Sequence, residues 1–313
     1  MNAPEVSLRV GVALGAGSAA AMAQIGALEV LAEAGIPVHC VAGTSAGAMV
    51  GAALAAGRLA EFRAAMEGLT RRRVRRLLDL AWPREGLLHG LRALEFVRPH
   101  LGEEIEDLDL PYAAVATDLR SGDEVALTSG GVFDAVRASI AIPGIFTPWR
   151  FGSRLLVDGG LVNPVPVSTA HALGAEFVIA MNVLPLRDLT SQRVSDHLKE
   201  LQASDGENGS RPEGEAIQDK LGLVEIVWSA SRILAAQIAT ARLRDDPPGF
   251  LLQIPVPEVG AFEFHRTAEL VEVGRRSAEQ ALPELRAALA RTLPIRRRLR
   301  RWQRRAAALL ASI

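Results

Sequence analysis

The sequence is poor in cysteine and lacks a long apolar run, and both shortages restrict what the protein can be. Cys40 is the only cysteine among 313 residues, so an intrachain disulfide is excluded and a reducing compartment such as the cytoplasm is expected. No uninterrupted apolar stretch approaches the roughly 18 residues that a membrane-spanning helix needs. The apolar run at residues 10–23 ends like a secretory signal, but glycines interrupt it and Glu5 precedes it. We therefore expect a soluble protein without a cleaved leader.

A large net charge is also missing, because 35 lysines and arginines face 36 aspartates and glutamates. The net charge of −1 argues against a nucleic-acid-binding protein. The charge is nevertheless divided unevenly along the chain. Residues 291–313 contain eight arginines and no acid, which leaves 27 basic and 36 acidic residues, a charge of −9, in the rest. The C-terminal segment therefore differs in charge from the remainder of the protein.

Short apolar segments alternate with helical patterns near the N-terminus. Residues 8–14 and 38–42 are apolar and rich in β-branched side chains, which predicts buried strands. Helical patterns follow at residues 19–33 and 45–56, and a glycine ends each of them. This alternation is typical of parallel strands in an α/β sheet, and a hydrophobic content of 49% is enough for a sizeable core. Further strands are predicted at residues 112–117, 154–157, 177–183 and 250–255.

The composition changes between residues 187 and 220. The stretch SDGENGSRPEGE at residues 204–215 has almost nothing to bury, so we predict a disordered surface loop here. Another predicted strand follows the loop, so the loop need not separate two domains. We therefore expect one α/β domain over residues 8–290, followed by a basic helix over residues 291–313.

The sequence GTSAG at residues 43–47 places Ser45 in a G-x-S-x-G motif. A strand is predicted before the motif and a helix directly after it, which is the setting of a nucleophilic serine on a sharp turn. Gly43 and Gly47 provide the room that such a turn requires. The alternative is that Ser45 caps an ordinary helix.

Asp158 ends the strand predicted at residues 154–157 and precedes Gly159 and Gly160. A serine nucleophile needs a base, either directly or through an oriented histidine, and Asp158 is a candidate for it. The alternative is an aspartate in a common Asp-Gly turn.

Three histidines are eligible by position for a Ser–Asp–His triad, which runs in that order in α/β hydrolases. They are His171, His197 and His265. None has a loop context that singles it out, and a serine peptidase or thioesterase with such a triad remains an alternative. The histidines do not combine with Cys40 or carboxylates at a metal-ligand spacing, so no metal site is expected.

Several stretches together are similar to the patatin-like phospholipase family, in its bacterial branch. The first strand with its glycine turn, the GTSAG motif and the Asp-Gly-Gly sequence carry the resemblance. Supporting stretches are AAVATDL at 113–119, AVRASIAIPGIFTP at 135–148, VDGGLVNPVPV at 157–167, DPP at 246–248 and FHR at 264–266. The resemblance covers about residues 8–282. It implies a three-layer α/β sandwich with a mainly parallel central sheet.

The resemblance also implies a serine lipid acyl hydrolase with a Ser–Asp dyad and no cofactor. Ser45 would attack the carbonyl of an acyl ester while Asp158 accepts its proton, and water would then release the acyl-enzyme. Gly159 and Gly160 would let the loop of Asp158 approach the serine. The substrate would be a phospholipid, a lysophospholipid or another acyl ester.

The family forms its oxyanion hole from backbone N–H groups of the first glycine-rich turn. In this sequence those groups belong to Gly15, Ala16, Gly17 and Ser18, with that of Ala46 as a further donor. The family turn usually ends in Arg-Gly, where this chain has Ala20 and Ala21, and its usual histidine is replaced by Gln24. Alanine at position 21 resists positive φ. The alternative is therefore a catalytically impaired member with a regulatory or lipid-binding role.

The C-terminal segment predicts an amphipathic helix that begins at Pro294. One apolar stripe has alternating spacings of four and three and comprises Ile295, Leu299, Trp302, Ala306, Leu309 and Ile313. Arginines fill most other positions of its first half, and such a helix favours peripheral binding to an anionic membrane. The alternatives are packing on the acidic body of the protein or a solvated tail. Nucleic-acid binding is disfavoured because only one aromatic residue accompanies the arginines.

Overall fold

The computed structural model describes residues 8–79, 87–185 and 223–310, with the side chains of residues 223–225 and 293–310 left out. The loop predicted at residues 187–220 lies outside the described residues. The central element is an eight-stranded mixed sheet with the order β5-β6-β3-β2-β1-β7-β8, and β4 pairs with β3. The parallel strands are β1 (Val10–Leu14), β2 (Cys40–Thr44), β3 (Tyr112–Asp118), β7 (Phe177–Asn182) and β8 (Phe250–Gln253). The antiparallel strands are β4 (Glu124–Leu127), β5 (Trp149–Phe151) and β6 (Arg154–Asp158).

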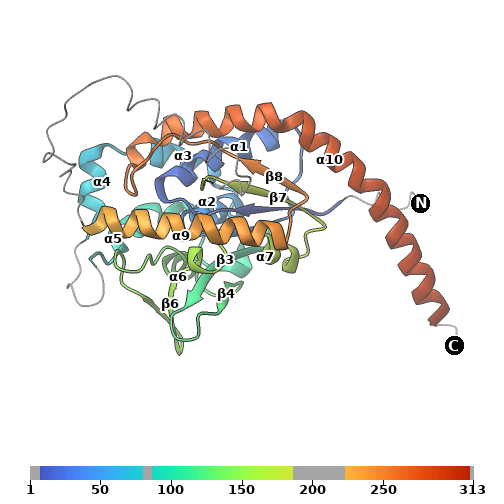
Figure 1. The fold of residues 1–313 in the computed structure, drawn as a ribbon, viewed down its shortest axis with the longest axis horizontal. Coiled ribbons are helices and arrows are strands. Elements are labelled where there is room, and N and C mark those ends of the chain that lie inside the picture. Colours follow the sequence, from blue (N-terminus) through green and yellow to red (C-terminus); the bar gives the residue numbers. More distant parts are fainter. Residues whose placement is uncertain (1–7, 80–86, 186–222, 311–313) are drawn as a thin grey trace, which may run out of the picture.

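Helices cover both faces of the sheet, which gives three layers (Figure 1). The larger core contains one set of alternate strand residues, such as Val12 and Leu14 of β1. It is covered by α1 (Ala23–Glu33), α2 (Ala46–Ala55), α3 (Leu59–Glu67) and α10 (Thr267–Leu310). The other face, which includes Ala13 of β1, is covered by α7 (Val167–Ala172) and α9 (Leu223–Asp245). The predicted three-layer α/β fold with a mostly parallel sheet is confirmed.

Shorter helices complete the body and surround the ends of the central strands. They are α4 (Arg71–Leu77), α5 (Leu91–Val97) and α6 (Val132–Ser139). The 3₁₀ helices are η1 (Ser18–Met22), η2 (Arg98–His100), η3 (Ile105–Asp107), η4 (Gly159–Leu161) and η5 (Phe264–Arg266). The predicted helix at residues 19–33 therefore begins as a 3₁₀ turn and becomes α-helical at Ala23.

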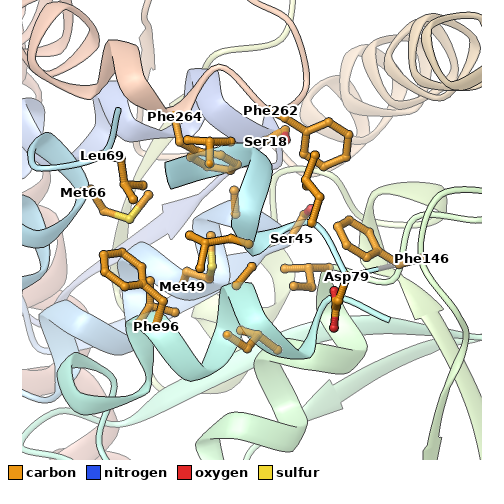
Figure 2. A pocket seen from close by; sticks show the side chains of 18 of the residues that line it. Ser18, Ser45, Met49, Met66, Leu69, Asp79, Phe96, Phe146, Phe262 and Phe264 are labelled. Atoms are coloured by element: carbon orange, nitrogen blue, oxygen red, sulfur yellow. The ribbon is translucent and has the colours of Figure 1, made fainter. Parts of the chain in front are cut away.

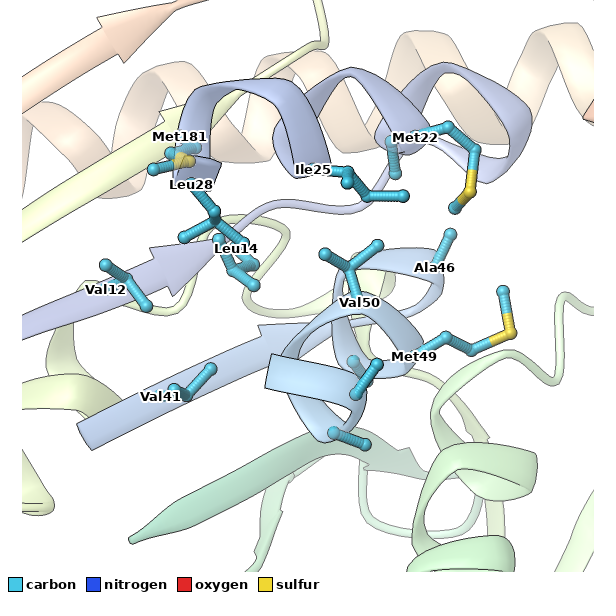
Figure 3. Packing of buried hydrophobic residues seen from close by; sticks show 14 of the residues in the cluster. Val12, Leu14, Met22, Ile25, Leu28, Val41, Ala46, Met49, Val50 and Met181 are labelled. Carbon is cyan, nitrogen blue, oxygen red and sulfur yellow. The ribbon is translucent and has the colours of Figure 1, made fainter. Parts of the chain in front are cut away.

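The central strands read as continuous apolar runs because both of their faces are covered. Every residue of β1, β2 and β7 is buried. Figure 3 shows Val12 and Leu14 of β1 packed under Ile25 and Leu28 of α1, beside Val50 of α2. This packing fixes β1 and β2 side by side, so the turns after both strands lie at the same edge of the sheet.

The C-terminal helix begins earlier than the sequence predicts. The sequence analysis starts it at Pro294, whereas α10 is one helix from Thr267 to Leu310 that passes through Pro283 and Pro294. The residues around both prolines are mostly Ala, Leu and Arg, which favour a helix, and this preference outweighs the two missing N–H donors. The last turns of α10 extend beyond the body (Figure 1). No helix in the described part of the chain is both long and apolar enough to span a membrane.

Candidate active site

Ser45 lies on the sharp turn between β2 and α2 in a strained backbone conformation. Its φ is 57°, and only one other non-glycine among the described residues, Ser18, has a positive φ. Such a conformation costs of order 1–3 kcal/mol and must be held by its surroundings. The Ser45 N–H donates to the Ser139 hydroxyl at 2.8 Å, and that hydroxyl donates in turn to the Val115 carbonyl. The side chain of Ser45 makes no capping hydrogen bond to α2, so the alternative of an ordinary helix cap is wrong.

The two glycines of the motif are required by close backbone contacts. A Cβ at Gly43 would lie 2.5 Å from the carbonyl oxygen of Gly47. A Cβ at Gly47 would overlap the carbonyl oxygen of Leu14 at the end of β1. A larger residue at Gly43 would push α2 away from β2, and one at Gly47 would push α2 away from β1. The glycines therefore hold Ser45 close to the glycine-rich turn that follows β1.

Asp158 accepts a hydrogen bond from Ser45 over 2.6 Å, from Oγ to Oδ2. Both residues are buried, with exposed fractions of 6% for Asp158 and 4% for Ser45. The other carboxylate oxygen accepts from the Gly160 N–H at 2.7 Å, which caps the short helix η4. Asp158 thus serves its Asp-Gly turn and faces the serine at once, so the two interpretations of this residue are compatible.

Sheet register explains how residues 113 positions apart come together. β2 pairs with β3 so that Thr44 lies opposite Val115, and β6 pairs with β3 so that Asp158 lies opposite Ala116. Ser45 and Asp158 therefore flank β3 at the same level. The backbone of Asp158 is fixed from two sides, because its N–H donates to Ala141 and its carbonyl accepts from the Thr117 hydroxyl.

Burial raises the pKa of Asp158 from its ordinary value of 3.8 to about 6. Desolvation disfavours the charged carboxylate, while the hydrogen bonds from Ser45 and Gly160 oppose part of that effect. A carboxylate with a pKa near 6 is largely ionised at neutral pH and is a stronger base than an exposed aspartate. It suits proton transfer from a serine hydroxyl better for that reason.

None of the histidines that the structure describes takes part in this arrangement. His171 is on α7, where its Nδ1 lies 2.9 Å from the Ala175 carbonyl oxygen, and His265 lies 3.0 Å from the Arg71 guanidinium. His197 lies outside the described residues. No histidine is among the described residues that line the cavities around Ser45. The geometry therefore gives no support to a histidine triad.

The glycine-rich turn after β1 offers fewer free donors than the resemblance implies. The Gly15 N–H donates to the Met181 carbonyl at 3.0 Å and the Ala16 N–H to the Pro164 carbonyl at 2.8 Å. These two groups are engaged in backbone hydrogen bonds, so the geometry does not support their expected role as oxyanion donors. The N–H groups of Gly17 and Ser18 have no acceptor in the described part of the chain, and both residues line the space next to Ser45.

The changed residues of the turn fit without strain. Ala20 and Ala21 lie in the 3₁₀ helix η1, and neither has a positive φ. The buried Gln24 donates from Nε2 to the Gly15 carbonyl at 2.7 Å, which ties the turn to α1. From the sequence, Gln24 is only a departure from the family pattern, and this supporting role was missed. The available signal was its position seven residues after Gly17, in the first turn of α1.

An apolar pocket adjoins Ser45 and has a volume of about 80 Å³ (Figure 2). Its walls come from helices α2 to α5, from the segment after α6 and from the segment before α10. The side chains around it include Met49, Met66, Leu69, Phe96, Phe146 and Phe264. Asp79 is its one acid among the described residues, and its carboxylate accepts from the backbone N–H groups of Gly90 and Leu91. This pocket could not be predicted from the sequence, because its walls are ordinary core residues of separate helices.

Two further cavities lie on the side of α9. The inner cavity, about 40 Å³, is lined by Gly17, Ser18, Ser45, Asp158 and Gly160, with Trp228, Ser231 and Arg232 of α9. The outer cavity, about 450 Å³, is lined by Gly17, Ala20, Trp228, Arg232, Gln253 and Glu258 among others. Ser45 lines both the apolar pocket and the inner cavity, so it lies where they meet.

The fold and the site define an α/β protein with a buried serine–aspartate pair on a strand–helix turn. A model of the patatin-like phospholipase family matches residues 12–171. An uncharacterised NTE family protein of Mycobacterium tuberculosis is 33% identical over 88% of this chain and 92% of its own length. Lysophospholipase NTE1 of Phaeosphaeria nodorum is 28% identical over 88% of this chain and 18% of its own length. The structure of VipD from Legionella pneumophila aligns with a TM-score of 0.42 and 13% identity, over 88% of this chain and 67% of VipD.

The chain belongs to the patatin-like phospholipase family. This membership confirms the resemblance seen in the sequence and indicates lipid acyl hydrolysis as the general activity.

Proposed function

We propose that this protein is a serine hydrolase that cleaves acyl esters of lipids through Ser45 and Asp158. The observation that carries the proposal is the 2.6 Å hydrogen bond between the two side chains at the junction of an apolar pocket and the inner cavity. A nucleophile in contact with its base, next to space for an acyl chain, is what the reaction requires.

The reaction takes two steps. Ser45 Oγ bonds to the acyl carbon while its proton passes to Asp158 Oδ2, and the ester C–O bond then breaks as Asp158 returns that proton to the leaving alcohol. Water next attacks the acyl-enzyme and gives a proton to Asp158. The bond between the acyl carbon and Ser45 Oγ breaks, the proton returns to the serine, and a fatty acid leaves.

The oxyanion formed in each step needs donors that are free and close to Ser45. We propose the N–H groups of Gly17 and Ser18, with that of Ala46 at the start of α2. They have no acceptors among the described residues, which supports this choice, as does the strained φ of 49° at Ser18, which re-aims the backbone beside the serine. Gln24 orients this turn through its hydrogen bond to the Gly15 carbonyl.

We further propose that the substrate carries a single acyl chain, which occupies the apolar pocket. The wall of large aliphatic and aromatic side chains supports an acyl occupant, since such a surface gains most from burying methylene groups. The name of the Phaeosphaeria nodorum relative, a lysophospholipase, agrees with a single-chain substrate.

Contact with a lipid surface is a further part of the proposal. The arginine-rich segment at residues 291–313 offers positive charge for an anionic membrane. On α9, which lines the inner cavity, the side chains of Ile226, Ile233 and Leu234 are each more than half exposed. Exposed aliphatic groups beside the cavity support approach to lipid from this side.

Turnover of a lysophospholipid and of a p-nitrophenyl acyl ester by the full-length protein tests the proposal. We expect the wild type to release fatty acid and Ser45→Ala to abolish this release. The control variant Ser153→Ala, at an exposed serine in the turn between β5 and β6, should retain it. Activity that survives Ser45→Ala would overturn the proposal. A wild-type protein that binds the lipid without turnover would instead support the impaired, lipid-binding alternative that the changes at Ala20 and Ala21 suggest.

A further inference from the structure

The leaving group of the substrate needs a place of its own, separate from the acyl chain. Ser18, Ser45 and Ile142 line both the apolar pocket and the inner cavity, and Gly17, Leu184, Trp228 and Arg232 line both the inner and the outer cavity. The three spaces therefore follow one another from the acyl side of Ser45 to the side of α9. An ester cleaved at Ser45 would place its alcohol part in the inner and outer cavities.

Arg232 is the one cation among the described residues that line these spaces. It is half-buried, on the face of α9 that also carries Trp228 and Ala235. Within the described structure Arg232 has no hydrogen bond or ion pair. Arg242 on the same helix differs, because it donates to the Val162 carbonyl and pairs with Glu124. Arg232 is thus a cation beside the nucleophile that has no partner among the described residues.

The charge of Arg232 matters because the inner cavity already holds the carboxylate of Asp158. A second anion that enters this cavity would be repelled unless a cation accompanies it. The outer cavity also has Ala20 in its wall, at the position where the family turn usually has arginine. In this chain the cation next to the turn comes from α9 instead.

We propose that Arg232 binds the phosphate of a single-chain phospholipid and so selects phosphate-bearing substrates over neutral acyl esters. The inference rests on the proposed function of Ser45 and Asp158 and assigns the headgroup side of that site. A guanidinium forms paired, charge-assisted hydrogen bonds with phosphate oxygens, and partial burial strengthens them. The acyl chain then lies in the apolar pocket and the phosphate in the cavities lined by α9.

The test compares hydrolysis of lysophosphatidylcholine and of a monoacylglycerol with the same acyl chain. We expect Arg232→Gln to lower kcat/KM for the lysophospholipid roughly 10- to 100-fold, mainly through KM, and to change the monoacylglycerol value less than about threefold. Arg232→Lys should retain part of the preference. Arg244→Gln, at an exposed arginine of the same helix, should leave both values unchanged. An equal loss on both substrates, or no loss on either, overturns the inference.

Binding separates this inference from the proposed function. Calorimetric titration of lysophosphatidylcholine into Ser45→Ala, with and without Arg232→Gln, needs no turnover. Weaker binding with Arg232→Gln supports the headgroup role even if the wild type does not hydrolyse the lipid. Inorganic phosphate distinguishes the two sources of a phosphate group. We expect inorganic phosphate to inhibit monoacylglycerol hydrolysis only weakly. If it inhibits as strongly as the lysophospholipid does, and if Arg232→Gln removes this inhibition, the site binds free phosphate instead.

Two variants exclude a merely structural role for Arg232. Ala20→Arg, added to Arg232→Gln, places a guanidinium in the wall of the same outer cavity and should restore part of the preference for the lysophospholipid. Glu258 is the one acid in that wall among the described residues. If Arg232 served only to pair with Glu258, Glu258→Gln would reproduce the loss and Ala20→Arg would not repair it.

Discussion

The two sides of Ser45 differ in chemistry although one serine borders both. On one side, side chains of α2 to α5 and of the segment after α6 form a wall of aliphatic and aromatic groups, whose one described acid accepts from the backbone at the start of α5. On the other side, the glycine turn, the Asp158 loop and α9 supply backbone N–H groups, a carboxylate and an arginine that has no partner among the described residues. The contrast is what our proposal requires, because it assigns the acyl chain to the packed apolar side and the leaving group to the charged side.

The largest effect on activity is expected at Ser45 and Asp158, which lie between the two sides and react with charged and neutral substrates alike. Asp158→Asn removes the proton acceptor while keeping the size of the side chain, so kcat should fall by about 10² to 10⁴ for charged and neutral esters alike. Rates of lysophospholipid and monoacylglycerol hydrolysis check this. A loss confined to one substrate would show that Asp158 acts on the leaving group rather than on Ser45.

The pKa of Asp158 predicts how the activity depends on pH. Since the carboxylate must be ionised to accept a proton, kcat/KM for both esters should fall about tenfold per pH unit below pH 6 and level off above it. A monoacylglycerol assay over pH 4.5–8.5 measures the profile without a titrating substrate phosphate. A flat profile through pH 6 would contradict the assigned role of this carboxyl group.

The same raised pKa predicts that the protein becomes less stable as pH rises, over the range in which its activity increases. The folded state holds the Asp158 proton more tightly than the unfolded state, so this residue lowers the free energy of unfolding as pH rises from about 4 to 6. The cost stays constant above pH 6 and amounts to about 3 kcal/mol for a shift of about two units. Asp158→Asn should therefore raise the thermal midpoint at pH 7.5 but not at pH 4. Equal midpoints for both proteins at pH 7.5 would contradict the burial argument.

A change confined to the apolar side should separate acyl chains by length. Ala93 of α5 lines the apolar pocket, and Ala93→Phe adds a ring where we place the acyl chain. The value of kcat/KM for long-chain p-nitrophenyl esters should fall about tenfold, while that for the acetate ester should hardly change. Leu91→Phe, at an exposed position of the same helix, is the control. An equal effect on all chain lengths would place the acyl chain elsewhere.

The smallest effect on catalysis is expected from the C-terminal segment, which lies away from both sides of Ser45. A form that ends at Arg291 should hydrolyse the soluble acetate ester at the wild-type rate but bind anionic vesicles more weakly, since it lacks seven arginines. Co-sedimentation with vesicles of phosphatidylglycerol and phosphatidylcholine measures the difference. Equal binding by both forms would contradict a membrane role for the segment.

The sequence predicted the parts of the site that depend on local backbone geometry. Ser45 is predicted from the G-x-S-x-G motif at a strand–helix junction, whereas the role of Asp158 as base comes from the family resemblance, because the residues alone also allow an ordinary Asp-Gly turn. The occupied N–H groups of Gly15 and Ala16 were missed, because their acceptors, Met181 and Pro164, come from distant segments. The cavities were missed for the same reason, because their walls come from segments that lie far apart in the sequence.

Elements at the edge of the sheet were also harder to predict than those at its centre. β1 and β2 are buried on both faces and read as apolar runs, whereas β4 and β5 were missed because they are short and partly exposed. Arg232 lies in α9, a helix that was not predicted from the sequence. Nothing in its neighbours along the chain indicates that α9 lies next to Ser45. Its significance appears only when the turn and α9 are seen to line one cavity.

Labelling of the protein with a fluorophosphonate probe, followed by mass spectrometry of its peptides, tests the Ser45–Asp158 pair most directly. The account predicts one probe adduct on Ser45 in the wild type, a much slower adduct in Asp158→Asn and none in Ser45→Ala. An adduct on another residue, or equal labelling of wild type and Ser45→Ala, would contradict the account.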